Sequence, residues 1–245
     1  MKLFTSVLLL LLVFSNSIFI CNSQAGRFKY YILAVQFTRS LCNCQGTPGF
    51  YSCDPKWKQD LPTTFSIHGL WENDWYGVKQ SSAKKFNLFE IISDATLRNG
   101  LYRDWVDAHV IYKSSNKDAD RRAAAERFWK SEWDKHGIFT GLTVHEYFRT
   151  TSNLFSSVGN IYARFQQDGL IMPGGKIDLN DVMNTLTIML GGFSPKLKCI
   201  ANQFGEEFLY EVEFLYDRAT LVRLNHFNPT FRGSCTSDIV SLKVN

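Results

Sequence analysis

Hydrophobic and polar residues alternate most regularly in the segment GEEFLYEVEFLYD, residues 205–217. Alternation with a period of two residues predicts a β-strand with two distinct faces. The segments YYILAVQF, residues 30–37, and TTFSIHGLW, residues 63–71, are short and rich in β-branched and aromatic residues, so they are also predicted strands. The two faces expected for 205–217 are Leu209, Glu211, Glu213 and Leu215 on one side, and Phe208, Tyr210, Val212, Phe214 and Tyr216 on the other.

Two other segments have the spacing and composition of helices. Residues 118–137, DADRRAAAERFWKSEWDKHG, are rich in helix-forming residues and end at a glycine. Residues 178–190, DLNDVMNTLTIML, begin with Asp178 or Asn180 as the expected N-cap. Predicted strands and helices do not alternate in βαβ order, so we expect an α+β fold, with a central antiparallel sheet flanked by helices.

The N-terminus has the pattern of a cleaved secretory signal. Lys2 supplies a positive start, residues 7–14 form an unbroken apolar run, and Ser23 and Ala25 are the small residues expected before a cleavage site. The run is shorter than the 20 or so residues of a membrane span. We therefore expect a signal peptide over 1–25 and a single domain over 26–245 that does not enter a membrane and is secreted, to the extracellular space or the vacuole.

Composition adds two constraints on partners and redox state. The formal net charge of the chain is +4, and removal of Lys2 leaves +3, which permits a polyanionic partner without demanding one. Five cysteines remain in the exported part, and an exported chain favours disulfides. We expect Cys199 to pair with Cys235, and Cys53 to pair with either Cys42 or Cys44, leaving one thiol that is free or bound to another molecule. A zinc site is the weaker interpretation, because no histidine or fourth cysteine is near.

Candidate chemistry lies in the heptad FSIHGLW, residues 65–71, and at the end of the predicted helix. Phe128, Glu132 and His136 are four residues apart on one helical stripe, and Lys135 lies at its edge. Taken separately, His68 is explained as a core histidine. Glu132 and Lys135 are explained as a surface ion pair, and His136 as a histidine at a helix C-terminus, where a positive charge is favoured. Taken together, two imidazoles with a carboxylate and an ammonium are what metal-free cleavage of RNA requires.

Aromatic residues accompany both segments. Trp71, Phe128 and Trp129 are candidates to stack on the bases of single-stranded RNA. The alternative is packing in the core, which we weight at least as highly for Trp129 and Trp133. The remaining histidines, His109, His145 and His226, match no motif and are expected to be structural or surface residues.

FSIHGLW and FWKSEWDKHG resemble the two active-site segments of the ribonuclease T2 family, whose usual forms are F-T-I-H-G-L-W-P and F-W-x-H-E-W-x-K-H-G-T-C. Weaker similarities are Gln36 in AVQF, GGFSPKLKC, FLYEVEF and RGSC, so the resemblance extends over residues 28–240. It implies an α+β fold and a secreted, monomeric endoribonuclease acting on single-stranded RNA rather than DNA. The product would be a 3′-nucleotide, formed through a 2′,3′-cyclic phosphate without metal or cofactor.

The resemblance also implies roles for individual residues. His136 would be the general base and His68 the general acid, with Glu132 and Lys135 stabilising the pentavalent phosphate. Trp71 would belong to the first base site, and Phe128 and Gln36 to the second. Asn73 stands where the family often has a base-binding aspartate.

Departures from the family pattern predict weaker activity. Ser131 replaces a histidine that helps to hold the phosphate, and a serine hydroxyl brings no positive charge. Glu72 replaces a proline and would add a negative charge beside the path of a polyanion. Phe139 and Leu215 replace cysteines whose expected partners are also missing, so two disulfides are lost. We expect reduced turnover, with two alternatives: a catalytically impaired storage, defence or binding protein, or a self-incompatibility determinant.

Overall fold

The computed structural model describes residues 29–44, 53, 58–73, 84–110, 113–225 and 233–242. The predicted signal peptide and His226 lie outside these residues. In the described part of the chain, no helix combines the length and the apolar character needed to cross a membrane.

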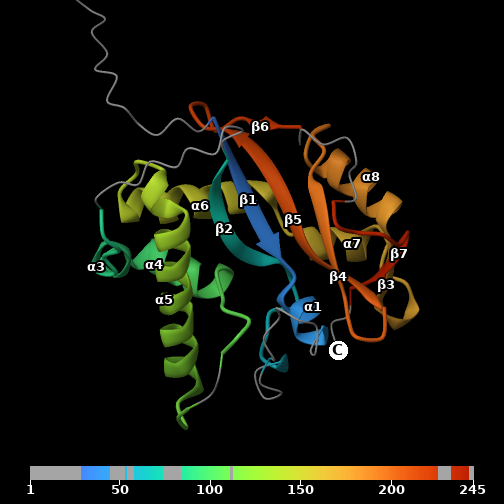
Figure 1. Cartoon of the computed structure of the whole chain (residues 1–245), viewed down its shortest axis with the longest axis horizontal. Helices are drawn as coiled ribbons and strands as arrows, with labels where there is room; N and C mark the ends of the chain where they lie inside the picture. Colours follow the sequence, from blue (N-terminus) through green and yellow to red (C-terminus); the bar gives the residue numbers. More distant parts are fainter. Residues whose placement is uncertain are drawn as a thin grey trace, which may run out of the picture.

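A seven-stranded sheet forms the centre of the molecule (Figure 1). Its strand order is β2-β1-β5-β7-β3, and β4 and β6 also pair with β5. All pairs are antiparallel except β5 with β7, which confirms the predicted α+β class. The strands are β1 Tyr30–Gln36, β2 Ser66–Asn73, β3 Lys176–Asp178, β4 Lys196–Ala201, β5 Glu207–Asp217, β6 Arg223–Leu224 and β7 Ile239–Ser241.

Helices cover the rear face of this sheet in the view of Figure 1, where α6 and α7 pass behind it and α5 stands beside it near β2. The predicted helix 118–137 corresponds to α5, which ends one residue before His136. Asp178 accepts hydrogen bonds from the backbone at the start of α8, so it is the N-cap rather than Asn180. The helices are α1 Thr38–Asn43, α3 Phe89–Ile92, α4 Ala95–Asp104, α5 Lys117–Lys135, α6 Val144–Val158, α7 Ile161–Gln167 and α8 Leu179–Met189, with short 3₁₀ turns η1 Gly137–Phe139 and η2 Pro173–Gly175.

The main core lies between the sheet and these helices. It takes alternate residues of the central strands, such as Leu33 and Val212, together with Tyr147 of α6. Trp129 and Trp133 of α5 are fully buried in the same cluster, and the Trp129 indole donates to the Trp105 carbonyl at 2.9 Å. The core interpretation of these two tryptophans is therefore confirmed. They do not stack on a base.

The predicted alternation along β5 is wrong at one point. Lys198 of β4 pairs with Glu211 and the next residue pairs with Leu209, so Tyr210 is an extra, bulged residue. Leu209 consequently packs in the main core with Val212, although the simple alternation would place it beside Glu211. A bulge of this kind shifts the pattern of faces by one residue.

The disulfide pairs are Cys42–Cys53 and Cys199–Cys235, which resolves the choice between Cys42 and Cys44. Cys44 is a fully buried thiol, which excludes the intermolecular alternative in the folded chain. Burial, with a smaller contribution from a nearby carboxylate, raises its pKa to about 12.

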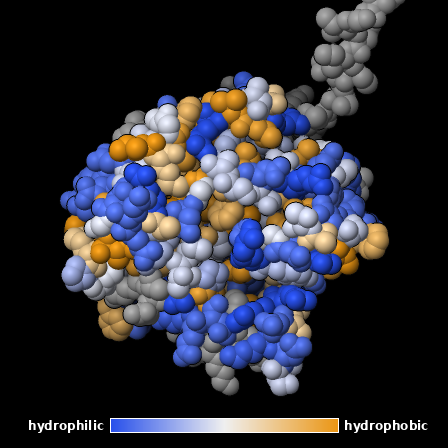
Figure 2. Space-filling model, turned by 180° about the vertical axis from the view of Figure 1, so that it is seen from behind, coloured by the Kyte–Doolittle hydropathy of each residue, from blue (hydrophilic) through white to orange (hydrophobic). Residues whose placement is uncertain are grey.

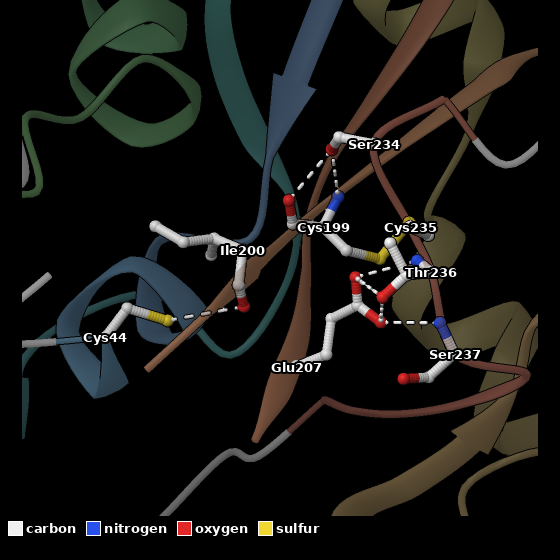
Figure 3. The surroundings of a disulfide bond; sticks show 8 residues. All are labelled: Cys44, Cys199, Ile200, Glu207, Ser234, Cys235, Thr236 and Ser237. Atoms are coloured by element: carbon white, nitrogen blue, oxygen red, sulfur yellow. Dashed lines mark hydrogen bonds between the residues drawn. A yellow bond between two sulfur atoms is a disulfide. The ribbon is translucent and has the colours of Figure 1, made fainter. Parts of the chain in front are cut away.

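Polar contacts fasten the chain around the second disulfide (Figure 3). The Ser234 hydroxyl binds both the backbone N–H and the carbonyl of Cys199, and the Glu207 carboxylate accepts the backbone N–H groups of Thr236 and Ser237. Where the resemblance expects further cysteines, Leu215 is buried in β5 and Phe139 lies in η1.

On the rear face, hydrophobic side chains form small groups between hydrophilic ones (Figure 2). The most exposed large apolar side chains of the described residues come from separate elements: Phe89 from α3, Ile188 from α8 and Phe204 from the turn between β4 and β5. Single exposed apolar residues of this kind are ordinary in folded proteins.

Candidate active site

His68 occupies a β-bulge in the edge strand β2. Ala34 of β1 pairs with Gly69 and Val35 pairs with Ile67, so His68 is the extra residue between them. Bulges turn a side chain out of the regular alternation, and they are common beside active sites. The side chain keeps 30% of its surface exposed, which leaves it accessible to a substrate.

A buried carboxylate holds the His68 ring. The Nδ1 atom of His68 lies 2.5 Å from Oε2 of Glu211 in β5, and Glu211 is only 1% exposed. Burial alone would lower the pKa of His68, but its hydrogen bond to Glu211 and the charges of Glu211 and Glu132 more than offset this, so the pKa is raised above its ordinary value. The protonated form of His68 is therefore favoured.

The pKa of Glu211 moves in the opposite direction. Burial would raise it, but the hydrogen bond from His68, the charge of His68 and the charge of Lys198 lower it below the ordinary value. Both shifts favour the form of the Glu211–His68 pair in which a carboxylate lies beside an imidazolium. Neither Glu211 nor Lys198 was singled out from the sequence as a site residue.

His136 lies directly after α5, where its backbone N–H donates to the Glu132 carbonyl at 2.9 Å. Its Nδ1 atom lies 3.3 Å from Oε2 of Glu72 in β2, and the side chain is 22% exposed. The sequence suggested that Glu72 would repel the substrate from beside its path. In the structure the Glu72 side chain is only 3% exposed and turned toward His136, so its charge contacts this histidine.

Trp71 links the two histidines. The centre of its ring system lies 5.1 Å from the centre of the His68 ring and 5.5 Å from that of His136. Its indole N–H donates to Oε2 of Glu132 at 3.0 Å. A Cβ atom on Gly69 would lie 2.4 Å from that oxygen and 2.5 Å from the indole nitrogen, so this hydrogen bond requires a glycine in the strand.

A cavity of about 550 Å³ opens beside His68. It brings together several residues that the sequence analysis selected, including Gln36, Phe128 and Ser131. The Phe128 ring lies 5.8 Å from the His68 ring, at a tilt of 33°. The lining residues are Gln36, Leu41, His68, Asp107, Ala108, His109, Arg127, Phe128, Ser131, Glu132, Lys135 and Tyr210.

Glu132 and Lys135 differ in exposure although both line this cavity. The Glu132 side chain is 3% exposed and the Lys135 side chain 63%, with 3.9 Å between Nζ of Lys135 and Oε1 of Glu132. Lys135 can therefore swing toward an anion while Glu132 stays fixed by Trp71. Asn73, the last residue of β2, pairs with Tyr30 at the far end of that strand and does not line the cavity.

Known proteins resemble this chain over most of its length. A model of the Ribonuclease T2 family matches residues 28–232, a range that contains both histidines and every lining residue of the cavity. The chain belongs to the ribonuclease T2 family. Membership places it among the endoribonucleases and confirms the resemblance drawn from the two motifs.

Curated relatives of this T2 ribonuclease include plant enzymes. Ribonuclease 1 of Arabidopsis thaliana is 26% identical, and Extracellular ribonuclease LE of Solanum lycopersicum is 24% identical; both alignments cover 86% of each chain. Among solved structures, ribonuclease MC1 from bitter gourd seeds superposes with a TM-score of 0.66 at 18% identity, covering 88% of this chain and 100% of that one. RNase NT in complex with 5′-AMP gives 0.63 at 22% identity, covering 87% and 97%. These structures confirm the fold.

Several residues that line this cavity were not selected from the sequence. Asp107, His109, Arg127 and Tyr210 line the cavity, and His109 was expected to be structural or superficial. Tyr210 reaches the cavity because it is the bulged residue of β5, a feature that period-two alternation does not reveal. His145, by contrast, pairs with Asp94 at the start of α4, which fits the structural role expected of it. Over the described residues, no cluster of three or more histidine, cysteine or acidic side chains has the arrangement of a metal site.

Proposed function

We propose that this T2 ribonuclease cleaves single-stranded RNA by transphosphorylation, without a metal ion, and releases 3′-nucleotides through a 2′,3′-cyclic phosphate. The observation that carries the proposal is the pair of imidazoles, His68 and His136, each with Nδ1 directed at a buried carboxylate and both against Trp71. With Nδ1 held in this way, Nε2 of each ring is the atom that meets the substrate.

In the first step, Nε2 of His136 accepts the proton of the ribose 2′-hydroxyl as its oxygen forms a bond to phosphorus. The bond between phosphorus and the 5′-oxygen breaks, and His68 donates a proton to that oxygen. In the second step the roles reverse: His68 takes a proton from water as the water oxygen bonds to phosphorus, and His136 donates a proton to the 2′-oxygen as its bond to phosphorus breaks. The raised pKa of His68 supports its assignment as the acid of the first step.

Charge that develops on the phosphorane oxygens needs donors that are already in place. Lys135 supplies a cation at the cavity, and Glu132 holds the Trp71 indole between the histidines. Ser131 also lines the cavity, where its neutral hydroxyl replaces the histidine of the usual motif. We therefore propose weaker phosphate binding than in relatives with the complete motif, with reduced rather than absent turnover.

Base binding is proposed for the aromatic and amide side chains around the phosphate site. Phe128 and Gln36 line the cavity beside His68 and would hold one base, and Trp71 would contact the other. Asn73 lies at the end of β2 opposite Tyr30, and neither it nor Trp71 lines the cavity, but Trp71 contacts both histidine rings. We also propose that the active form is a secreted monomer comprising residues 26–245 after removal of the signal peptide, with RNA rather than DNA as substrate.

The test is cleavage of single-stranded RNA by the purified mature protein, in EDTA, from pH 4 to 8. His68→Ala and His136→Ala should each lower kcat by at least about a hundredfold, since acid–base catalysis contributes about 10²–10⁴. His145→Ala is the matched control, because this histidine pairs with Asp94 away from the cavity. The proposal is supported if the wild type and His145→Ala form cyclic-phosphate products and His68→Ala and His136→Ala do not. A folded wild type without activity would refute the proposal and favour a binding or storage role. His68 or His136 variants that cut RNA at the wild-type rate would refute the assignment of these two histidines.

A further inference from the structure

Four charged side chains form a continuous ladder on the face of the sheet that carries His68. Lys198 and Lys196 of β4 lie directly opposite Glu211 and Glu213 of β5. Nζ of Lys198 lies 2.9 Å from Oε1 of Glu211 and also contacts Oε1 of Glu213, and Nζ of Lys196 lies 3.4 Å from Oε2 of Glu213. The ladder ends at His68, which meets the remaining oxygen of Glu211.

These carboxylates lie in surroundings that disfavour charge. Glu211 is 1% exposed and Glu213 is 3% exposed, and burying an ionised carboxylate is strongly unfavourable unless it is paired and hydrogen-bonded. Opposed lysines on the neighbouring strand meet this requirement. Such an arrangement at a catalytic histidine indicates a functional role beyond sheet pairing.

Two backbone bulges bring the ladder to His68. The extra residue Tyr210 sets the register in which Glu211, rather than a neighbour, faces Lys198. Glu211 also pairs with Gln36 of β1, and the bulge at His68 in β2 lies two strands away from β5. Because both bulges occur on this part of the sheet, the His68 ring reaches across β1 to the Glu211 carboxylate.

We infer that Glu211 is the positioning residue of the acid: paired with His68 and with Lys198 it is ionised, and by its contact with Nδ1 of His68 it holds that ring in one orientation with its proton in place. The inference rests on the proposed function and deepens it. The pairing of His136 differs, since its carboxylate, Glu72, lies at the longer distance of 3.3 Å. The two histidines are therefore held unequally, which matches the different tasks of acid and base.

Other charged groups also face His68 and contribute to its titration. Glu132 on α5 favours the protonated ring, and Lys198 opposes it. The remaining charged or titratable groups that line the cavity with His68 are Asp107, His109, Arg127, Lys135 and Tyr210. Of all these groups, Glu211 alone hydrogen-bonds the ring of His68, so its replacement should have the largest effect.

The decisive variant is Glu211→Gln, which keeps the shape of the side chain and removes its charge. His68 must be protonated to act as the acid, so the alkaline limb of the kcat/KM profile reports its pKa. Loss of an adjacent opposite charge should move this limb to lower pH by about 1–2 units. Glu213→Gln is the matched control, because it removes a charge from the same ladder without touching His68. Its alkaline limb should stay within a few tenths of a unit of wild type.

Lys198→Met tests the sign of the effect. Lys198 lowers the pKa of His68, so its removal should move the alkaline limb to higher pH, opposite to Glu211→Gln. A role confined to folding would lower the melting temperature of all three variants without displacing the limbs in opposite directions. If the alkaline limb of the kcat/KM profile lies at the same pH in Glu211→Gln and wild type, in proteins shown to be folded, the inference is overturned.

A measurement independent of turnover separates this inference from the proposed function. Titration of the His68 ring proton by NMR gives its pKa in wild type and in Glu211→Gln whether or not the protein cuts RNA. An inactive wild type with a downward shift in the variant would refute the ribonuclease mechanism and retain the role of Glu211. An active wild type, with the same pKa of His68 in wild type and in Glu211→Gln, would retain the ribonuclease mechanism and refute the role of Glu211.

Discussion

Ser131 lies one helical turn before Lys135 on α5, and both side chains line the cavity beside His68. Replacing Ser131 with histidine would restore the usual motif of the family at this position. The imidazole would point into the same cavity, where its protonated form can pair with a phosphate oxygen. Ser131→His should therefore raise activity toward RNA while leaving the acid and base in place.

The expected gain follows from the charge and its exposure. A unit charge about 5 Å from a phosphate oxygen contributes about 0.8 kcal/mol in water and about 3 kcal/mol at an effective dielectric constant of about 20. Ser131 is half-buried at the cavity, so an intermediate value of about 1.4 kcal/mol is appropriate, equivalent to about tenfold in kcat/KM. Because the ordinary pKa of histidine is about 6.5, the gain should be present at pH 5 and largely absent at pH 8.

The assay compares kcat/KM for a short single-stranded oligonucleotide at pH 5 and pH 8 in wild type, Ser131→His and Ser131→Gln. Glutamine donates a hydrogen bond without charge, so it separates the effect of charge from that of a longer polar side chain. A gain confined to histidine at low pH supports a depleted phosphate site. The same rate in all three proteins would refute the reasoning and show that activity is limited elsewhere.

Two further predictions concern stability and the geometry of the site. Removing the Cys199–Cys235 disulfide with a double alanine substitution opens a loop of 36 residues, which should reduce the free energy of unfolding by about 4 kcal/mol in the chain-entropy model. Denaturation by guanidinium measures this loss, and an unchanged midpoint would contradict it. Gly69→Ala would place a methyl group 2.4 Å from Glu132 and 2.5 Å from the Trp71 indole, at a cost of about 1–3 kcal/mol. We expect lower thermal stability and lower kcat/KM, and wild-type values for both would show that the strand relaxes without cost.

The local pattern of the sequence predicted much of the fold. Alternation identified β5, helical composition identified α5 and α8, and the segments around residues 30–37 and 63–71 became β1 and β2. The prediction was wrong in the first part of β5, where the extra residue Tyr210 moves Leu209 into the core. A bulge depends on which strands pair and in which register, and the sequence of one strand does not contain that information.

In the site, too, the sequence predicted neighbours that are close in the chain and missed those that are far apart in it. Glu132, Lys135 and His136 were predicted together because they lie within five residues at the end of one helix, where short-range spacing fixes which side chains are neighbours. Glu211 is separated from His68 by 143 positions in the chain, and Glu72 from His136 by 64. No periodicity connects residues so far apart, and the negative charge of Glu72 alone suggested repulsion of the substrate.

The sequence by itself therefore determined the chemical groups: two histidines with a neighbouring carboxylate and ammonium, a chain able to form an α+β fold, and cysteines able to form two bridges. Only the tertiary structure decided that Cys42 pairs with Cys53, that Trp71 contacts both imidazoles, and that each histidine has its own buried carboxylate. The physical reason is that local propensity acts over a few residues. The partners of a buried charge are instead set by strand register, bulges and the packing of α5 against the edge of the sheet.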